Sequence, residues 1–155
     1  MKFIVDANVG KLAKWLRLMG HDARFFEGRD DSEMILIALH EDRVILTRDT
    51  HVMEWGAISS GRIKAILVEG DEPGTQIRQV IRQLNLNPQS KPFTVCLECN
   101  EPLHEVDKTA VQDRVPPYVF RTQQQFVECP RCHRVYWRGT HWQAMLKKLE
   151  KLNEV

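Results

Sequence analysis

Two aspartates stand at the ends of short apolar runs. Asp6 follows residues 3–5, and Asp49 lies one residue past Arg48, after residues 44–47. Short runs rich in β-branched residues are typical of buried parallel strands, and ligands bind beyond the carboxyl ends of such strands. Carboxylates gathered there repel one another unless a cation or a proton offsets their charge. These residues therefore predict a Mg²⁺ or Mn²⁺ site suited to phosphoryl chemistry.

More acids lie between these two, in the stretch Asp30-Asp31-Ser32-Glu33. Asp30 and Glu33 fit the Asp-x-x-Glu pattern of a helix capping box, and Asp49 before Thr50 is placed to cap a helix as well. No capping pattern requires Asp6 at its strand end. Two interpretations stay open for the acids, because each could cap a helix or all could bind a metal together.

The chain has four cysteines, arranged as two Cys-x-x-Cys pairs. They are Cys96, Cys99, Cys129 and Cys132. Thiolates at this spacing bind one ion from a tight turn, and two such turns supply the four ligands of a structural zinc site. Two disulfides or four separate buried thiols are the alternatives, but the chain has no secretion features that would favour disulfides. We therefore expect one structural zinc ion with no open coordination position.

The hydrophobic period predicts strands that alternate with helices in the first part of the chain. In order, the pattern predicts strand 3–6, helix 10–19 ending at Gly20, strand 22–26, helix 32–42, strand 44–47, a short helix or turn near 50–57, strand 64–69 and helix 75–86. This alternation indicates a mostly parallel sheet with helical crossovers. A strand order of the 2-1-3-4 type would make the first and third strands neighbours and bring Asp6 and Asp49 side by side.

Residues 87–92 contain two prolines and predict a linker, so we place a domain boundary at residue 90. This gives a first domain over 1–90 and a metal-stabilised module with a closing helix over 91–155. Within the module we expect strand-like pieces at 118–120 and 134–137 and a helix at 141–153. A basic and aromatic group there could bind RNA or pack on the first domain. Its members are Arg131, Arg134, Arg138, Tyr136 and Trp137.

Composition limits the class of protein. The formal net charge of the 155 residues is +1, which argues against coating nucleic acid through bulk charge but permits a local basic groove. Lys11, Lys14 and Arg17 recur at three-residue spacing and form either a phosphate-binding stripe or a solvated helix face. The N-terminus has no signal-peptide core and no apolar run is long enough to span a membrane, so we expect a cytoplasmic protein without a membrane partner.

An ordered set of motifs resembles the Mut-seven C-terminal RNase domain family. The matching stretches are Phe3-Ile4-Val5-Asp6, residues 10–22 (GKLAKWLRLMGHD), Leu46-Thr47-Arg48-Asp49, Cys96-x-x-Cys99-Asn100, the second cysteine pair and residues 136–141 (YWRGTH). The resemblance spans nearly the whole chain. It implies an α/β, PIN-like three-layer fold with a mostly parallel sheet, followed by a small zinc ribbon and a C-terminal helix.

The resemblance also implies roles for single residues. Asp6 and Asp49 match the acidic strand-end positions of the family, and a third acid is expected ahead of the second helix. Asp30, Asp31 and Glu33 compete for that place, and we favour Asp31.

The function implied is a metal-dependent ribonuclease that uses Mg²⁺ or Mn²⁺ and leaves 5′-phosphate and 3′-hydroxyl products. Lys14, Arg17 and Arg48 would position the RNA backbone. The main alternative is a non-catalytic RNA- or ribosome-binding zinc-ribbon adaptor. A toxin-like nuclease held in check by a partner is a third and less favoured reading.

Overall fold

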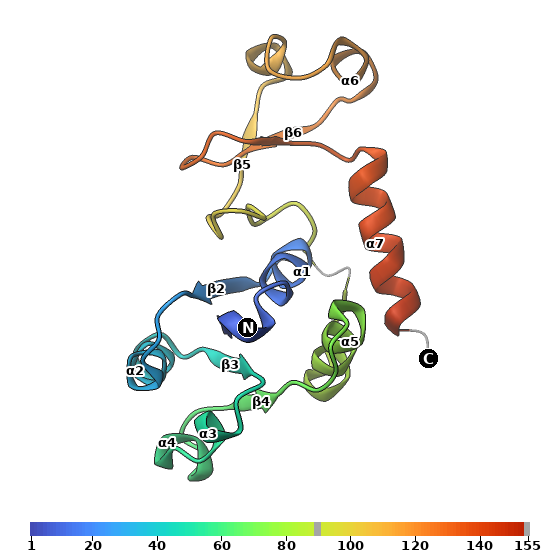
Figure 1. Ribbon diagram of the computed structural model, residues 1–155. Helices are drawn as coiled ribbons and strands as arrows, with labels where there is room; N and C mark the ends of the chain where they lie inside the picture. Colours follow the sequence, from blue (N-terminus) through green and yellow to red (C-terminus); the bar gives the residue numbers. More distant parts are fainter. Residues whose placement is uncertain (89–90, 154–155) are drawn as a thin grey trace.

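The computed structural model describes residues 1–88 and 91–153 of the chain and contains two β-sheets (Figure 1). Residues 89–90, which include the predicted domain boundary, and residues 154–155, the end of the predicted second domain, lie outside the described residues. No helix among the described residues is long and apolar enough to cross a membrane.

The first sheet has four parallel strands in the order β2-β1-β3-β4. Its strands are β1 (Lys2–Asp6), β2 (Asp22–Phe26), β3 (Val44–Thr47) and β4 (Ala65–Leu67). Val5 of β1 pairs with Leu46 of β3, so both strands end at the same edge of the sheet. The order is of the 2-1-3-4 type, so the residues that follow β1 and β3 lie side by side.

Helices cover both faces of this sheet, and the alternation of side chains along the strands separates two cores. Phe3 and Val5 pack on the face covered by α1 (Leu12–Leu18) and α5 (Pro73–Leu84). Ile4 and Ile45 pack on the opposite face, with α2 (Asp31–Glu41), α3 (Thr50–Met53) and α4 (Gly56–Ser59). The three-layer α/β architecture is therefore confirmed (Figure 1).

The first helix begins later than the period predicts. A 3-10 helix, η1 (Ala7–Val9), follows β1, and α1 starts at Leu12. Its predicted stop is confirmed, because the chain turns at Gly20 with a φ of +91°. A Cβ at Gly20 would lie 2.2 Å from the carbonyl oxygen of Lys91, so only glycine fits both the backbone angle and the close approach of the second part of the chain.

The second part contains a three-stranded antiparallel sheet in the order β5-β6-β7. Its elements are β5 (His104–Val106), the 3-10 helix η2 (Lys108–Val111), α6 (Pro117–Thr122), β6 (Phe126–Glu128), β7 (Val135–Tyr136) and α7 (Thr140–Asn153). The strand expected at 118–120 is wrong, because this segment lies in α6. Pro117 sits in the first turn of α6, where its fixed φ favours a helix, and three apolar residues are too few to reveal the period.

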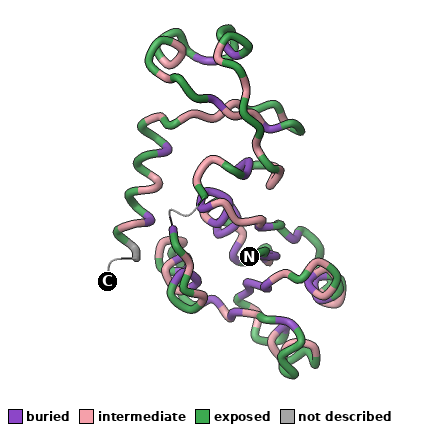
Figure 2. Tube along the Cα trace, turned by 180° about the vertical axis from the view of Figure 1, so that it is seen from behind, coloured by how far each residue is buried: buried purple, intermediate pink, exposed green. Residues whose placement is uncertain are grey.

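The two parts of the chain share one hydrophobic core. Leu97, Trp142 and Leu149 belong to the same buried cluster as Leu12 and Val5. Figure 2 shows buried positions concentrated in the layers around the first sheet. The part of the chain around α6, which lies far from this sheet, is mostly exposed. The domain boundary at residue 90 therefore stays a prediction. The hydrophobic core includes residues from both sides of it.

Candidate active site and metal centre

Asp6 is the last residue of β1, and both of its carboxylate oxygens accept hydrogen bonds. Oδ1 accepts a bond from the backbone N–H of Ala7 at 2.9 Å, which caps η1. Oδ2 accepts a bond from the hydroxyl of Thr47 at 2.7 Å. The expectation that Asp6 serves no cap is therefore wrong, since a 3-10 helix follows β1 where the sequence pattern indicated none. The carboxylate is held at the edge of the sheet by the backbone of η1 and by Thr47 of the neighbouring strand β3.

Thr47 is fully buried at the end of β3 and connects two of the predicted site acids. Its hydroxyl donates to Asp6 and accepts a hydrogen bond of 3.1 Å from the backbone N–H of Asp49. Asp49 in turn accepts a bond of 2.9 Å from the N–H of His51 and caps α3, as its position before Thr50 suggested. Asp6 and Asp49 therefore lie at the same edge of the sheet, and the Thr47 hydroxyl bonds to both residues.

Asn8 provides a third link between the ends of β1 and β3, and no sequence pattern marked it as a site residue. Its side-chain oxygen accepts a bond of 3.1 Å from the backbone N–H of Arg48, and its amide nitrogen lies 3.4 Å from Oδ2 of Asp6. A single Asn after a strand carries no motif of its own. The signal that could have found it is the pairing of β1 with β3, which places the residues following both strands together.

Asp30 and Asp31 have different environments at the start of α2. Asp30 is the N-cap of α2, and its Oδ1 accepts bonds of 2.9 Å from the N–H and 2.6 Å from the hydroxyl of Ser32. These bonds lower the pKa of Asp30. Within the described residues, the structure gives no hydrogen bond to the Asp31 carboxylate, which is half-buried in the first turn of α2.

The pKa of Asp31 is raised, first by burial and then by the negative charges of Asp49 and Asp6. Asp30 also raises it, and His51 opposes the effect. A carboxylate whose pKa rises because of two other carboxylates lies within electrostatic reach of both. Of the acids competing ahead of α2, Asp31 is thus the one coupled to the two strand ends.

The three acids form a looser group than the cysteines. Among the described residues, only the four cysteines have metal-ligating atoms that all lie within 4.8 Å of one another in a set of three or more. Oxygen ligands suit a hard cation such as Mg²⁺, which keeps several waters and needs only one or two direct carboxylates. The acids therefore fit an ion held partly through water, and not a fully protein-ligated cage.

The four cysteines are Cys96, Cys99, Cys129 and Cys132, and each pair forms the same turn. In the first pair, the N–H of Cys99 points to Sγ of Cys96 at 3.5 Å, and Asn100 follows with a φ of +63°. In the second pair, the N–H of Cys132 points to Sγ of Cys129 at 3.5 Å, and His133 follows with a φ of +65°. Two matched turns that present four sulfurs to one point fit a tetrahedral zinc ion.

The first cysteine turn is fastened to the first sheet by buried polar groups. The Arg17 guanidinium donates 2.8 Å and 3.0 Å bonds to the carbonyls of Leu97 and Ala23. Asn100 accepts from the N–H of Ala23 at 2.8 Å and donates to Asp22 at 2.6 Å. Burial opposes ionisation of Asp22, but its hydrogen bonds lower its pKa. These hydrogen bonds therefore fix the position of the first cysteine turn relative to the first sheet.

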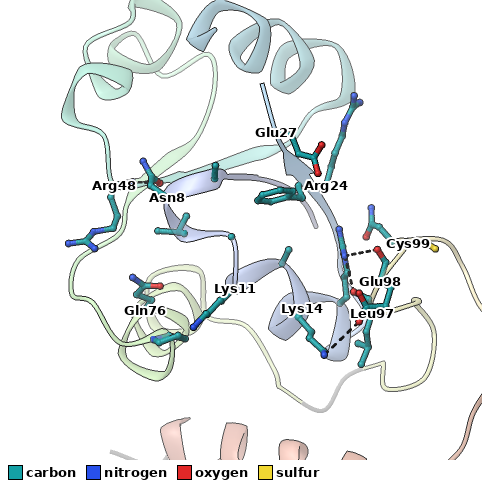
Figure 3. A pocket seen from close by; sticks show the side chains of 18 of the residues that line it. Asn8, Lys11, Lys14, Arg24, Glu27, Arg48, Gln76, Leu97, Glu98 and Cys99 are labelled. Carbon is teal, nitrogen blue, oxygen red and sulfur yellow. Dashed lines mark hydrogen bonds and ion pairs between the residues drawn. The ribbon is translucent and has the colours of Figure 1, made fainter. Parts of the chain in front are cut away.

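A groove of about 1280 Å³ runs from the strand ends of the first sheet to the cysteine turns (Figure 3). Asn8, Arg48 and Glu27 line it where β1, β3 and β2 end, and Glu98 and Arg131 line it near the cysteines. Asp6, Asp31 and Asp49 are not in its lining, but Ala7 and Arg48, the chain neighbours of Asp6 and Asp49, are part of it.

The predicted phosphate-binding cations have three different environments. Lys14 is half exposed in the groove and pairs with Glu98 at 3.7 Å, and Arg48 pairs with Asp71 at 3.0 Å. Arg17 is only 8% exposed and serves the backbone carbonyls of the cysteine turn, although part of it reaches the groove lining. We therefore do not retain Arg17 as a phosphate contact. Lys14 and Arg48 remain the candidate phosphate contacts.

Part of the basic and aromatic group in the ribbon is used for packing. Tyr136 packs against the core of the first sheet, and its hydroxyl lies 3.2 Å from Sγ of Cys96. Trp137 packs on the separate small core of the ribbon, around Val111 and Phe126. The alternative that these aromatics pack is therefore confirmed for Tyr136, and Trp137 packs within the ribbon instead of on the first domain.

The chain combines a four-stranded parallel sheet, acids at adjacent strand ends and a pair of cysteine turns that could hold one metal ion. The model of the Mut7-C RNAse domain matches residues 1–149, and the chain belongs to this family. Comparison with curated proteins finds no match, and neither does comparison with solved structures.

Proposed function

We propose that this protein is a metal-dependent ribonuclease in which Asp6, Asp31 and Asp49 hold Mg²⁺ or Mn²⁺. The observation that carries the proposal is the shared Thr47 hydroxyl, which joins the strand-end sites of Asp6 and Asp49. Asp31 is the acid whose pKa responds to both. Family membership adds support for a nuclease that acts on RNA.

The chain's own residues supply binding and orientation. When bound, the divalent ion supplies Lewis acidity that lowers the pKa of an attacking water and offsets charge on the phosphodiester. Asp31, which is not committed to a cap, is the side chain free to move toward the ion, whereas Asp6 is held by Thr47. Lys14 and Arg48 bind backbone phosphates along the groove and exchange their partners Glu98 and Asp71 for RNA. Exposed ion pairs of this kind are weak, so the exchange costs little.

We propose that the four cysteines hold one structural zinc ion. Their closed set of four sulfurs leaves no open position, so the ion stabilises the ribbon and takes no part in hydrolysis. The ribbon helps RNA binding by forming one wall of the groove, through Glu98, Asn100 and Arg131.

The test is cleavage of an end-labelled RNA with Mn²⁺ present, using Asp6→Asn, Asp49→Asn and the control Asp113→Asn. Asp113 is exposed and lies in the ribbon, so its change removes one negative charge away from the acids. We expect both site variants to lose cleavage by a factor of about 100 or more while keeping the wild-type far-ultraviolet spectrum. Cleavage at the wild-type rate in both site variants would overturn the mechanism.

A second candidate is a non-catalytic RNA- or ribosome-binding adaptor. It is favoured by one observation, which is that Asp6 and Asp49 each accept a capping N–H bond and so have a structural use of their own. The discriminating measurement is thermal stabilisation by Mn²⁺, because a preformed site binds the ion in the folded state only. A shift in melting temperature that Asp31→Asn abolishes supports the nuclease, and no shift in the wild type supports the adaptor.

A further inference from the structure

A second cavity of about 410 Å³ lies where α1 meets α7, apart from the strand ends. Its lining residues are Lys11, Lys14, Trp15, His141, Ala144, Met145 and Lys148. Lys11 and Lys14 also line the groove, so the two cavities are adjacent along α1. Neither the acids nor the cysteines contribute to this cavity.

The cavity combines an aromatic ring with positive charge. Trp15 is half-buried, packs against the core and also lines the cavity. The ammonium group of Lys148 lies 5.8 Å from the centroid of the Trp15 ring. None of the described residues that line the cavity is acidic, and Lys14 pairs with Glu98 at the groove side.

A nucleotide is the ligand whose chemistry matches this lining. Its base stacks on an indole ring, and its phosphate pairs with lysine, as in proteins that bind single strands without reading sequence. A cation–π contact made by an exposed lysine is weak, so Lys148 can leave the Trp15 ring to a base and move to the adjoining phosphate. The bases of a duplex are already paired and stacked. A duplex could therefore bind the lysines through its phosphates but could not stack a base on Trp15.

We infer that the cavity between α1 and α7 binds a nucleotide of single-stranded RNA that extends beyond the cleavage site, with its base on Trp15 and its phosphate on Lys148. This inference rests on the proposed nuclease function for the path of the strand. The chain then runs from the strand ends along Lys11 and Lys14 to α7, and the pocket sets a preference for unpaired RNA.

The test measures binding of a labelled single-stranded oligonucleotide by fluorescence anisotropy, with Ca²⁺ in place of Mn²⁺ to keep the RNA whole. Lys148→Gln and Trp15→Leu are compared with Lys147→Gln, the same charge change at the exposed neighbour on α7. We expect Lys148→Gln to weaken binding and to reduce the slope of log affinity against log salt by about 0.7, as for one lost phosphate contact. Trp15→Leu is expected to weaken binding by a factor of about 5 or more without changing that slope.

Wild-type affinity in Lys148→Gln, or equal affinity of the wild type for duplex and single strand, would overturn the inference. Competition by poly-glutamate that Lys148→Gln abolishes and Trp15→Leu leaves intact would also overturn it, since it would indicate an acidic protein partner. Because Lys148 is exposed, its variant tests the pocket even if Trp15→Leu fails to fold. Binding that follows these expectations without cleavage in Mn²⁺ would reject the nuclease and keep the pocket.

Discussion

The hydroxyl of Thr47 donates a hydrogen bond of 2.7 Å to the carboxylate of Asp6 across the β1–β3 pair. Thr47 is fully buried and also accepts the backbone N–H of Asp49. One side chain therefore orients one acid and positions the backbone of another. Loss of this hydroxyl would leave the half-buried Asp6 carboxylate and Asp49 N–H without this partner.

Replacement Thr47→Val removes the hydroxyl and keeps the shape of the side chain. We predict a loss of about 1 to 3 kcal/mol in the free energy of unfolding, because two half-buried polar groups, one of them a carboxylate, lose a hydrogen bond. Mn²⁺ affinity should fall by a factor of about 10, as for partners that orient a metal ligand. Urea denaturation and calorimetric titration measure the two effects. Thr47→Ser is the control, which keeps the hydroxyl and should retain Mn²⁺ binding, and equal Mn²⁺ affinity in all three proteins would contradict the role given to Thr47.

Asp31 should lower stability at neutral pH. Its folded-state pKa is raised, so between the unfolded value near 3.8 and the higher folded value the native state binds more protons. The free energy of unfolding contributed by Asp31 therefore falls as pH rises through this window. We predict that Asp31→Asn stabilises the protein above the window and that this gain disappears below the unfolded pKa. Thermal melts across pH measure this.

Asp30 is the matched comparison, because its pKa is lowered by its bonds to Ser32. Its contribution to stability is present above the unfolded pKa of 3.8 and is lost as pH falls through the lower folded value. Asp30→Ala should therefore destabilise at neutral pH, opposite in sign to Asp31→Asn. A change in stability of the same sign in both variants at neutral pH would contradict the pKa shifts assigned to these two residues.

Arg17 should matter for stability more than for RNA binding. Arg17→Met keeps most of the side-chain volume but leaves the carbonyls of Leu97 and Ala23 without their donor. We predict a loss of about 2 kcal/mol or more in the free energy of unfolding. Lys14→Met removes an exposed ion pair and should cost less than about 1 kcal/mol. Urea denaturation separates them, and equal losses would show that Arg17 does not fasten the cysteine turn.

Removal of zinc by a chelator should unfold the ribbon before the first sheet. The small ribbon core around Val111, Val115 and Phe126 is too little to hold β5 to β7 without a metal. We predict that hydrogen exchange protection is lost in β6 and is retained in β1 and β3. Metal analysis should find one zinc per chain in the wild type, whereas Cys132→Ser should lose it. Full protection of β6 in the zinc-free protein would contradict this account.

The parallel sheet was predictable because apolar runs rich in β-branched residues, such as 3–5 and 44–47, alternate with helical patterns, whereas this alternation alone did not decide the order of the strands. The ribbon was not, since β7 has only two residues and Val119 and Phe120 read equally well as strand or helix. The cysteine group followed from spacing alone. Asn8 and Thr47 could not be selected, because their roles arise only from the pairing of β1 with β3. Arg17 fitted a surface stripe, yet the second part of the chain covers it.

Crystals soaked in Mn²⁺ and measured for anomalous scattering test the central claim most directly. We predict one strong zinc peak at the four cysteines and a separate manganese peak between Asp6, Asp31 and Asp49, with the Asp31 side chain turned toward it. The manganese peak should be absent in crystals of Asp31→Asn, while the zinc peak remains. A map with the zinc peak alone in the wild type, at a Mn²⁺ concentration that supports RNA cleavage, would contradict the assignment of these acids.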